Sequence, residues 1–181
     1  MPRITEARWE DWDGTTRQEV VLTESGDKNH ARGSITAPDG RIVWRFEIEC
    51  DAAWRVRRAE VVPAEGQPLR LVADGGGNWF DGAGRAMPEL AGALDLDLSA
   101  TAFTNTLPIR RCNLALNESV DIVTAYVAFP DLTIIADPQR YTRIGARSYR
   151  YDSRDSDFSR EIDVDENGLV INYPGLFRRL A

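Results

Sequence analysis

The chain has 181 residues, of which 43% are hydrophobic and 28% charged, and its formal net charge is -7 at pH 7. This length and apolar content exclude a disordered chain and favour one domain, which we expect to span residues 1–181. The acidic balance excludes most nucleic-acid-binding proteins, because phosphates are bound by a basic face. No apolar run approaches the roughly 20 residues that cross a bilayer. The first residues contain acids and no apolar segment, so we expect no secretory signal. We therefore expect a cytoplasmic protein without an integral membrane segment.

Alternation of apolar and polar residues with a period of two predicts strands along most of the chain. The clearest case is Trp44–Cys50, where large apolar side chains alternate with charged ones. Turn signals that contain glycine separate the strands, and short helical turns are expected near 88–93 and 174–180. In chain order, the predicted strands are 19–23, 44–50, 69–73, 121–127, 132–136, 148–151, 161–164 and 169–173, with turns at 25–27, 38–40, 75–78 and 166–168.

The spacing of these strands, roughly 8–12 residues, predicts an all-β roll, barrel or sandwich. The sequence also shows a weak internal similarity. Residues 46–56 and 149–160 both predict an aromatic strand, an acidic corner and a further strand. Each is followed by a hydrophobic strand that ends near an aromatic residue. Two repeated β-units or chance resemblance between strands would both explain this internal similarity.

The sequence predicts no catalytic set, no metal site and no cofactor. His30 is the single histidine and falls in a predicted surface turn, and the two cysteines, Cys50 and Cys112, lack the spacing of metal ligands. The segment Asp163–Gly168 begins like a calcium loop, but its twelfth position is Pro174 instead of glutamate. A hairpin turn is the better interpretation of that segment.

The stretch LDLDLSATAFTNTLPIRR, at 94–111, combines alternating leucines and aspartates with a polar run. In a strand, Asp95 and Asp97 point to the same face, and the opposite face carries small and apolar residues. If the polar face meets water, this is an ordinary solvated strand, which is the more common case. If it lines a cavity, it suits a polyhydroxylated group, with an aromatic ring for stacking. By alternation, that face also carries Ser99, Thr101, Phe103 and Asn105.

The end of this stretch predicts a corner followed by another strand. The side chains of Thr104–Pro108 can bond to the local backbone and hold a tight turn. Arg110 and Arg111 would then point to opposite faces of the resumed strand. One of them could bind a carboxylate or phosphate in a fork geometry.

Three segments, 94–111, 139–153 and 162–179, resemble the blocks of the bacterial putative glycolipid-binding family. The turn at Asp74–Trp79, the early tryptophan strands and the chain length are also similar, and TNTLPIRR is the most specific part. The resemblance covers nearly the whole chain. It implies a single-domain β-roll, an open, barrel-like curved antiparallel sheet of two similar β-units around an interior groove. It also implies a likeness in shape to carriers of lipids and lipoproteins, which is an analogy of fold.

The resemblance makes the matching polar and aromatic residues candidates for a ligand wall, with an internal polar network as the alternative. The expected partner is a small amphipathic molecule such as a glycolipid, whose apolar chain would pack against Trp44, Phe46 and Trp54. The candidate ligand-binding residues are Asp95, Asp97, Phe103, Thr104, Asn105, Thr106, Arg110, Arg111, Arg140, Tyr141 and Tyr151.

Two other classes of function remain as alternatives. An enzyme could act on a small polar or lipid-like substrate through the carboxylates of Asp95 or Asp97, with an arginine as anion clamp. An interaction module would instead need an exposed apolar patch or a free sheet edge. The absence of a credible catalytic set favours the binding protein.

Overall fold

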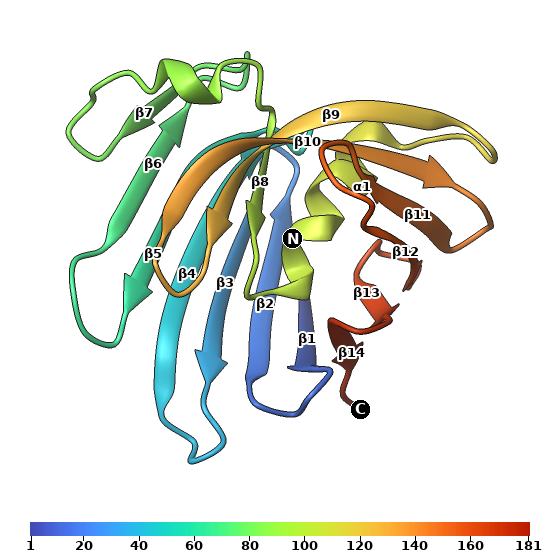
Figure 1. The fold of residues 1–181 in the computed structure, drawn as a ribbon, viewed down its shortest axis with the longest axis horizontal. Helices are drawn as coiled ribbons and strands as arrows, with labels where there is room; N and C mark the ends of the chain where they lie inside the picture. Colours follow the sequence, from blue (N-terminus) through green and yellow to red (C-terminus); the bar gives the residue numbers. More distant parts are fainter.

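Fourteen strands form one curved, unclosed sheet in the computed structural model, which describes residues 1–181 (Figure 1). One α-helix and two short 3-10 helices complete the fold. Neither the helix nor the 3-10 turns are long and apolar enough to cross a membrane. The strands are β1 (Arg3–Asp11), β2 (Arg17–Ser25), β3 (Lys28–Thr36), β4 (Ile42–Asp51), β5 (Val56–Pro63), β6 (Leu69–Ala73), β7 (Trp79–Asp81), β8 (Asp95–Leu98), β9 (Ser119–Ala128), β10 (Thr133–Arg143), β11 (Ser148–Ser153), β12 (Ser159–Val164), β13 (Val170–Tyr173) and β14 (Phe177–Arg179), and the helices are η1 (Pro88–Leu90), η2 (Ala102–Asn105) and α1 (Thr106–Cys112).

The sheet consists of two runs of consecutive strands that meet at β1 and β14. Its order is β7-β6-β5-β4-β3-β2-β1-β14-β13-β12-β11-β10-β9-β8. All neighbours are antiparallel except β8, which pairs in parallel with β9 between Asp95↔Thr124 and Leu98↔Val127. The expected all-β class and the open, curved antiparallel sheet are confirmed. The division into two runs of seven strands agrees with two β-units.

Period-two alternation explains why these segments become strands with one buried face. In β2, Gln18, Val20 and Leu22 are buried, while the residues between them are exposed. Each of the eight predicted strands overlaps an observed one, although β10 extends to Arg143, beyond the predicted end at 136. None of the eight covers β1, β3, β5, β7 or β14. His30 lies within β3 and was wrongly expected in a turn. The expected helical turn at 174–180 is also wrong, because a turn and β14 occupy it.

The predicted corner and second strand in 94–111 are wrong as well, because this segment becomes helical after β8. Thr101 begins η2 by accepting a hydrogen bond from the Phe103 backbone N–H, and α1 follows without a break. Pro108 is tolerated because it lies in the first turn of α1, where its missing N–H has no partner to lose. Asn113 ends the helix in the left-handed conformation at φ 44°.

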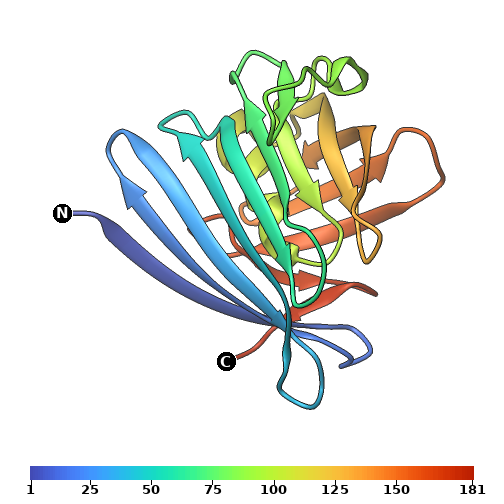
Figure 2. The ribbon, with the colours of Figure 1, turned by 90° about the vertical axis from the view of Figure 1, so that its left-hand side faces the viewer.

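The helical segment fills the interior of the curved sheet. Every residue from Ala102 to Ile109 is buried, and Phe103 is fully enclosed. In Figure 2, the blue N-terminal strands and the orange C-terminal strands lie on either side of this yellow-green segment. The sheet and the helical segment together form one cluster of 37 buried hydrophobic residues. The expected interior groove is therefore closed along much of its length, and the hollow that remains lies beside η2.

Candidate ligand pocket

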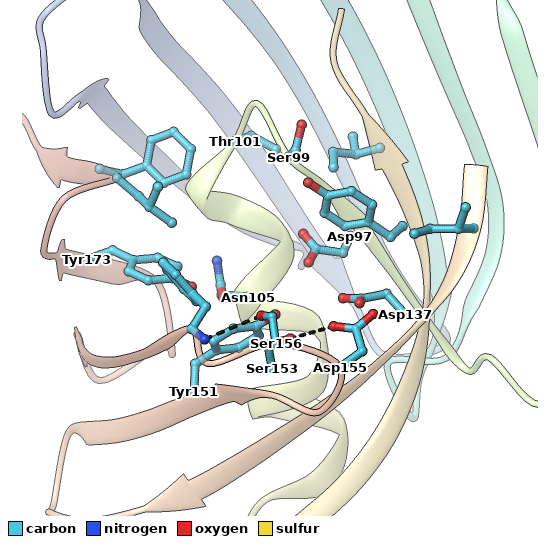
Figure 3. A pocket seen from close by; sticks show the side chains of 16 residues that line it. Asp97, Ser99, Thr101, Asn105, Asp137, Tyr151, Ser153, Asp155, Ser156 and Tyr173 are labelled. Carbon is cyan, nitrogen blue, oxygen red and sulfur yellow. Dashed lines mark hydrogen bonds between the residues drawn. The ribbon is translucent and has the colours of Figure 1, made fainter. Parts of the chain in front are cut away.

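A pocket of about 400 Å³ lies where β8, η2 and the second run of strands come together (Figure 3). Strand alternation directs Asp97 into it from β8, and β9, β10 and β11 supply further side chains. The loop from β11 to β12 and the turn before β14 complete the rim. Its 16 lining residues are Asp97, Leu98, Ser99, Thr101, Asn105, Tyr126, Ile135, Asp137, Tyr151, Ser153, Asp155, Ser156, Phe158, Tyr173, Leu176 and Phe177.

Two aspartates share one amide group at the base of the pocket. The Nε2 of Gln139 donates to Oδ2 of Asp97 at 2.9 Å and to Oδ2 of Asp137 at 2.7 Å. The same nitrogen lies 3.2 Å from Oγ1 of Thr124, so its two hydrogens face three acceptors. The Thr104 hydroxyl donates to the other oxygen of Asp97 at 3.1 Å. Neutral donors alone therefore bind these two carboxylates.

Burial raises the pKa of both aspartates above the ordinary value. For Asp97, desolvation is the largest cause, opposed by the hydrogen bonds from Gln139 and Thr104. For Asp137, desolvation likewise raises the pKa, and the hydrogen bond from Gln139 opposes it. Asp155 adds a third carboxylate at the rim, where Ser153 donates to it at 2.7 Å. The lining contains no lysine, arginine or histidine, so the pocket is acidic.

Aromatic rings form much of the remaining wall. Tyr151 packs edge-on against Phe158 with ring centroids 5.9 Å apart, and Tyr173 packs in the same way against Phe177 at 6.3 Å. Tyr126 adds a third phenol from β9. A wall of rings beside a floor of carboxylates can bind a sugar, because the rings cover its C–H face while the oxygens accept its hydroxyl protons.

The mouth of the pocket carries aliphatic side chains beside Asp155 and continues into a second hollow. Ile135 and Leu176 are large, exposed aliphatic residues at the rim. A neighbouring hollow of about 320 Å³ shares Ser99, Leu176 and Phe177 with the pocket. That hollow adds the side chains of Trp12 and Phe129. The second hollow also contains Asp11, Asp13 and Thr16, so the apolar surface that leads outward from the acidic floor is a strip of Leu176, Phe177, Trp12 and Phe129 beside polar residues.

The structure brings three of the predicted site residues into the pocket. Asp97, Asn105 and Tyr151 line it (Figure 3). Two more act through these: Thr104 bonds to Asp97, and the Tyr141 hydroxyl donates to Oδ1 of Asn105 at 2.9 Å.

Four further predicted residues lie away from the pocket, in internal polar contacts or in the core. Asp95 is fully buried and forms a forked ion pair with Arg111, with N–O distances of 2.6–3.1 Å. Phe103 is in the core, and Thr106 donates to the Gly168 carbonyl at 2.9 Å.

The two remaining arginines are also occupied elsewhere. Arg110 bonds to Glu24 and to the Asn167 carbonyl, and it lies over the ring of Trp54 at 4.4 Å. Arg140 pairs with Asp121 on the surface. No arginine is placed to clamp an anion in the pocket.

The aromatic residues expected along an apolar chain lie outside the pocket. Phe46 and Trp54 are buried in the core. Trp44 is partly buried and packs edge-on against Phe129, with ring centroids 4.8 Å apart. Phe129 lines the neighbouring hollow, so Trp44 packs against a lining residue of that hollow without lining it itself.

Sequence reasoning named Arg140 and Tyr141 of β10 but missed Asp137 and Gln139 in the same strand. Asp137, Gln139 and Tyr141 alternate in this strand and all three are buried, which is the pattern that marks one face of a strand. Pro138 interrupts this alternation in the sequence, and a predicted strand is normally ended at a proline. In the structure it is paired opposite Val123 within the ladder. Extending the alternation across Pro138 would have identified Asp137 and Gln139.

The sequence matches one protein family, and the structure is similar to one solved structure. A family described as "Putative glycolipid-binding" matches residues 6–179. The crystal structure of a DUF1089 family protein from Pseudomonas aeruginosa is 37% identical in sequence, over 90% of this chain and 92% of that chain, with a TM-score of 0.75. No curated protein matches the sequence.

Proposed function

Because the chain belongs to the putative glycolipid-binding family, we propose that it is a non-enzymatic binding or carrier protein for a glycolipid or a similar amphipathic small molecule. The observation that carries this proposal is the composition of one pocket. Its floor is polar, its walls are aromatic and its rim carries the aliphatic side chains of Ile135 and Leu176 beside Asp155. A ligand with a hydroxylated head and an apolar chain matches all three parts.

The head would occupy the floor of the pocket. Asp97 and Asp137 would accept hydrogen bonds from its hydroxyl groups, and Asn105 would fix the position of the wall beside them. The rings of Tyr151 and Tyr173 would pack against the C–H face of the sugar. Thr104 and Gln139 would orient Asp97 without touching the ligand.

The chain would leave across the mouth of the pocket. Ile135 and Leu176 offer it apolar surface at the rim, and the adjoining hollow continues along Trp12 and Phe129. Burying a chain there is favourable by about 0.8 kcal/mol per methylene group removed from water.

Native mass spectrometry tests the proposal directly. The purified protein would be delipidated, mixed with a bacterial lipid extract and examined for bound lipid. We expect a glycolipid or similar amphiphile to be retained by the wild type. Ser99→Phe, which adds a ring where the two hollows meet, should abolish retention, whereas Ser119→Phe on the exposed start of β9 should not. Failure of the wild type to retain any lipid would contradict the proposal.

An acid–base enzyme is the alternative, and the geometry supports it less well. Asp97 and Asp137 remain as a carboxylate pair in the pocket, but Asp95 is enclosed with Arg111 and no arginine lines the site. An enzyme would show turnover that Asp97→Asn removes, together with a bell-shaped pH profile. A carrier shows no turnover in either form.

A further inference from the structure

We propose that the head group in this pocket carries a positive charge, as an amino sugar or another small primary amine does. The inference rests on the proposed function and adds to it the chemical class of the head. Its basis is a set of buried acceptors that the protein supplies and does not neutralise.

The carboxylates of the pocket lack the cation that buried carboxylates normally have. Asp95, two residues from Asp97 in the same strand, is neutralised by the guanidinium of Arg111. Glu24 is paired with both Arg3 and Arg110. Asp97 and Asp137 share only a neutral amide and receive one hydroxyl. Because a buried charge is costly unless it is paired, the partner charge is expected from the ligand.

Polar groups without a protein partner point into the same space. Asp137 is 9% exposed, and its Oδ1 accepts no hydrogen bond from the protein. Tyr151 and Tyr173 are 8% and 4% exposed, they line the pocket, and their hydroxyls have no partner within the protein. Figure 3 shows these two tyrosines facing the aspartates across the pocket. None of these oxygens is among the fully enclosed unpaired atoms of the protein, so each is open to the pocket and available to bond to the N–H and O–H groups of a bound molecule.

An ammonium group fits this arrangement better than a neutral or an anionic one. It has three N–H donors, enough for Asp97, Asp137 and one tyrosine oxygen, all of which belong to residues that line the pocket. The rings of Tyr151 and Tyr173 add cation–π attraction, which strengthens when the cation is desolvated, whereas the ring of Phe158 already carries Arg160 at 4.7 Å. A phosphate or carboxylate head would meet three aspartates and no basic side chain, and like charges at short range repel strongly in a partly dry site.

A matched set of alkyl glycosides tests the proposal. Octyl glucoside, octyl 2-amino-2-deoxyglucoside and its N-acetyl derivative share one chain and one ring, and only the second is cationic. Their dissociation constants would be measured by calorimetry at a pH where the amine is protonated. We expect the amine to bind at least about tenfold tighter than both neutral probes, which corresponds to 1.4 kcal/mol. The preference should fall in Asp137→Asn and, by less, in the rim variant Asp155→Asn. It should persist in Asp131→Asn, a change of equal charge on the exposed β9–β10 turn.

The outcomes separate this inference from the function on which it rests. Equal binding of the cationic and neutral probes overturns the charged head and leaves a glycolipid-binding protein. A preference that survives both Asp137→Asn and Asp155→Asn overturns it too, because the charge would then be recognised elsewhere. If no probe binds, the charged head is overturned, while lipid retention in the mass spectrometry experiment decides the proposed function separately. Circular dichroism of each variant checks that the sheet is intact.

Discussion

Asp95 and Asp97 are two positions apart in β8 and lie in opposite electrostatic surroundings. Asp95 is fully buried and held by the planar fork of Arg111, a geometry that lysine could not reproduce. Asp97 opens into the pocket and is held by an amide and a hydroxyl. The first carboxylate is therefore neutralised within the fold, and the second lines the pocket without a cationic partner.

Removing Arg111 should destabilise the fold through the charge it leaves behind. Arg111→Met would leave the Asp95 carboxylate buried without a cation, and we expect a loss of about 3–5 kcal/mol in the free energy of unfolding at neutral pH. The loss should shrink in acid, where Asp95 becomes protonated. Urea unfolding at both pH values measures it. Arg140→Met, which breaks an exposed pair with Asp121, should change little, and equal losses in the two variants would contradict the prediction.

The pocket aspartates should make the protein less stable as the pH rises. Burial raises the pKa of Asp97 and Asp137 above the ordinary value of 3.8, so the folded state binds their protons more tightly than the unfolded state. The resulting stabilisation is fully present below pH 3.8. It is lost as the pH rises through the pKa values that the pair has in the folded state. Asp137→Asn should therefore flatten the decline in unfolding free energy above pH 3.8, measured by urea unfolding at a series of pH values.

Asp121 provides a control of opposite sign. The hydrogen bond from Arg140 lowers its pKa, so its contribution is present above the ordinary value and lost as the pH falls through the folded one. Asp121→Asn should therefore reduce stability at neutral pH relative to acid. The same pH dependence in Asp137→Asn and Asp121→Asn would show that the pocket aspartates are not the source.

At the scale of elements, close packing fixes how β3 and β4 meet. Gly33 is directly opposite Phe46, whose ring lies across the glycine and is buried in the core. A Cβ built on Gly33 would overlap the far edge of that ring. The close approach of the Phe46 ring therefore requires a glycine at position 33, since the strand conformation itself would accept any residue.

Gly33→Ala should lower stability by about 1–3 kcal/mol, because the Phe46 ring must leave its place in a packed core. Thermal unfolding measures the shift. Gly26→Ala, in a turn with nothing near the added carbon, should have little effect. Combining Gly33→Ala with Phe46→Leu should cost less than the two single changes added together. Simple additivity would argue against the steric explanation.

Across the whole molecule, a narrow seam joins two halves of one sheet. β1 and β14 pair over three residues, from Trp9↔Arg179 to Asp11↔Phe177. The indole of Trp9 donates to the Val170 carbonyl at 2.7 Å, and Gln18 of β2 accepts from the backbone N–H of Ala102 at 3.0 Å. Each half therefore depends on the other and on the helical segment between them.

The two halves should unfold together. All five tryptophans precede β8 and all five tyrosines follow it, so the two chromophores report separately on the two runs of strands. We expect tryptophan fluorescence and tyrosine absorbance to give coincident urea transitions, because one core spans both halves. Separated midpoints would contradict the shared core. Trp9→Phe, which removes the hydrogen bond across the seam, should shift both curves equally.

The sequence by itself determined the all-β class, the positions of most strands and the glycine turns between them. Alternation and turn chemistry are local, so they can be read from neighbouring residues. The resemblance carried by 94–111 identified the family, and Asp97, Asn105 and Tyr151 were named as candidates that the pocket now contains.

The tertiary structure alone decided which polar residues face the pocket. Arg110 bonds to Glu24, which is 86 positions away in the sequence, and Thr106 bonds to Gly168, which is 62 positions away. Such pairings follow from the curvature of the sheet around a helical segment, and alternation along 94–111 wrongly continued that segment as a strand. The surroundings of a side chain depend on neighbours that are distant in sequence. The fold therefore places Arg111 beside Asp95, whereas Asp97 and Asp137 face an acidic, aromatic pocket.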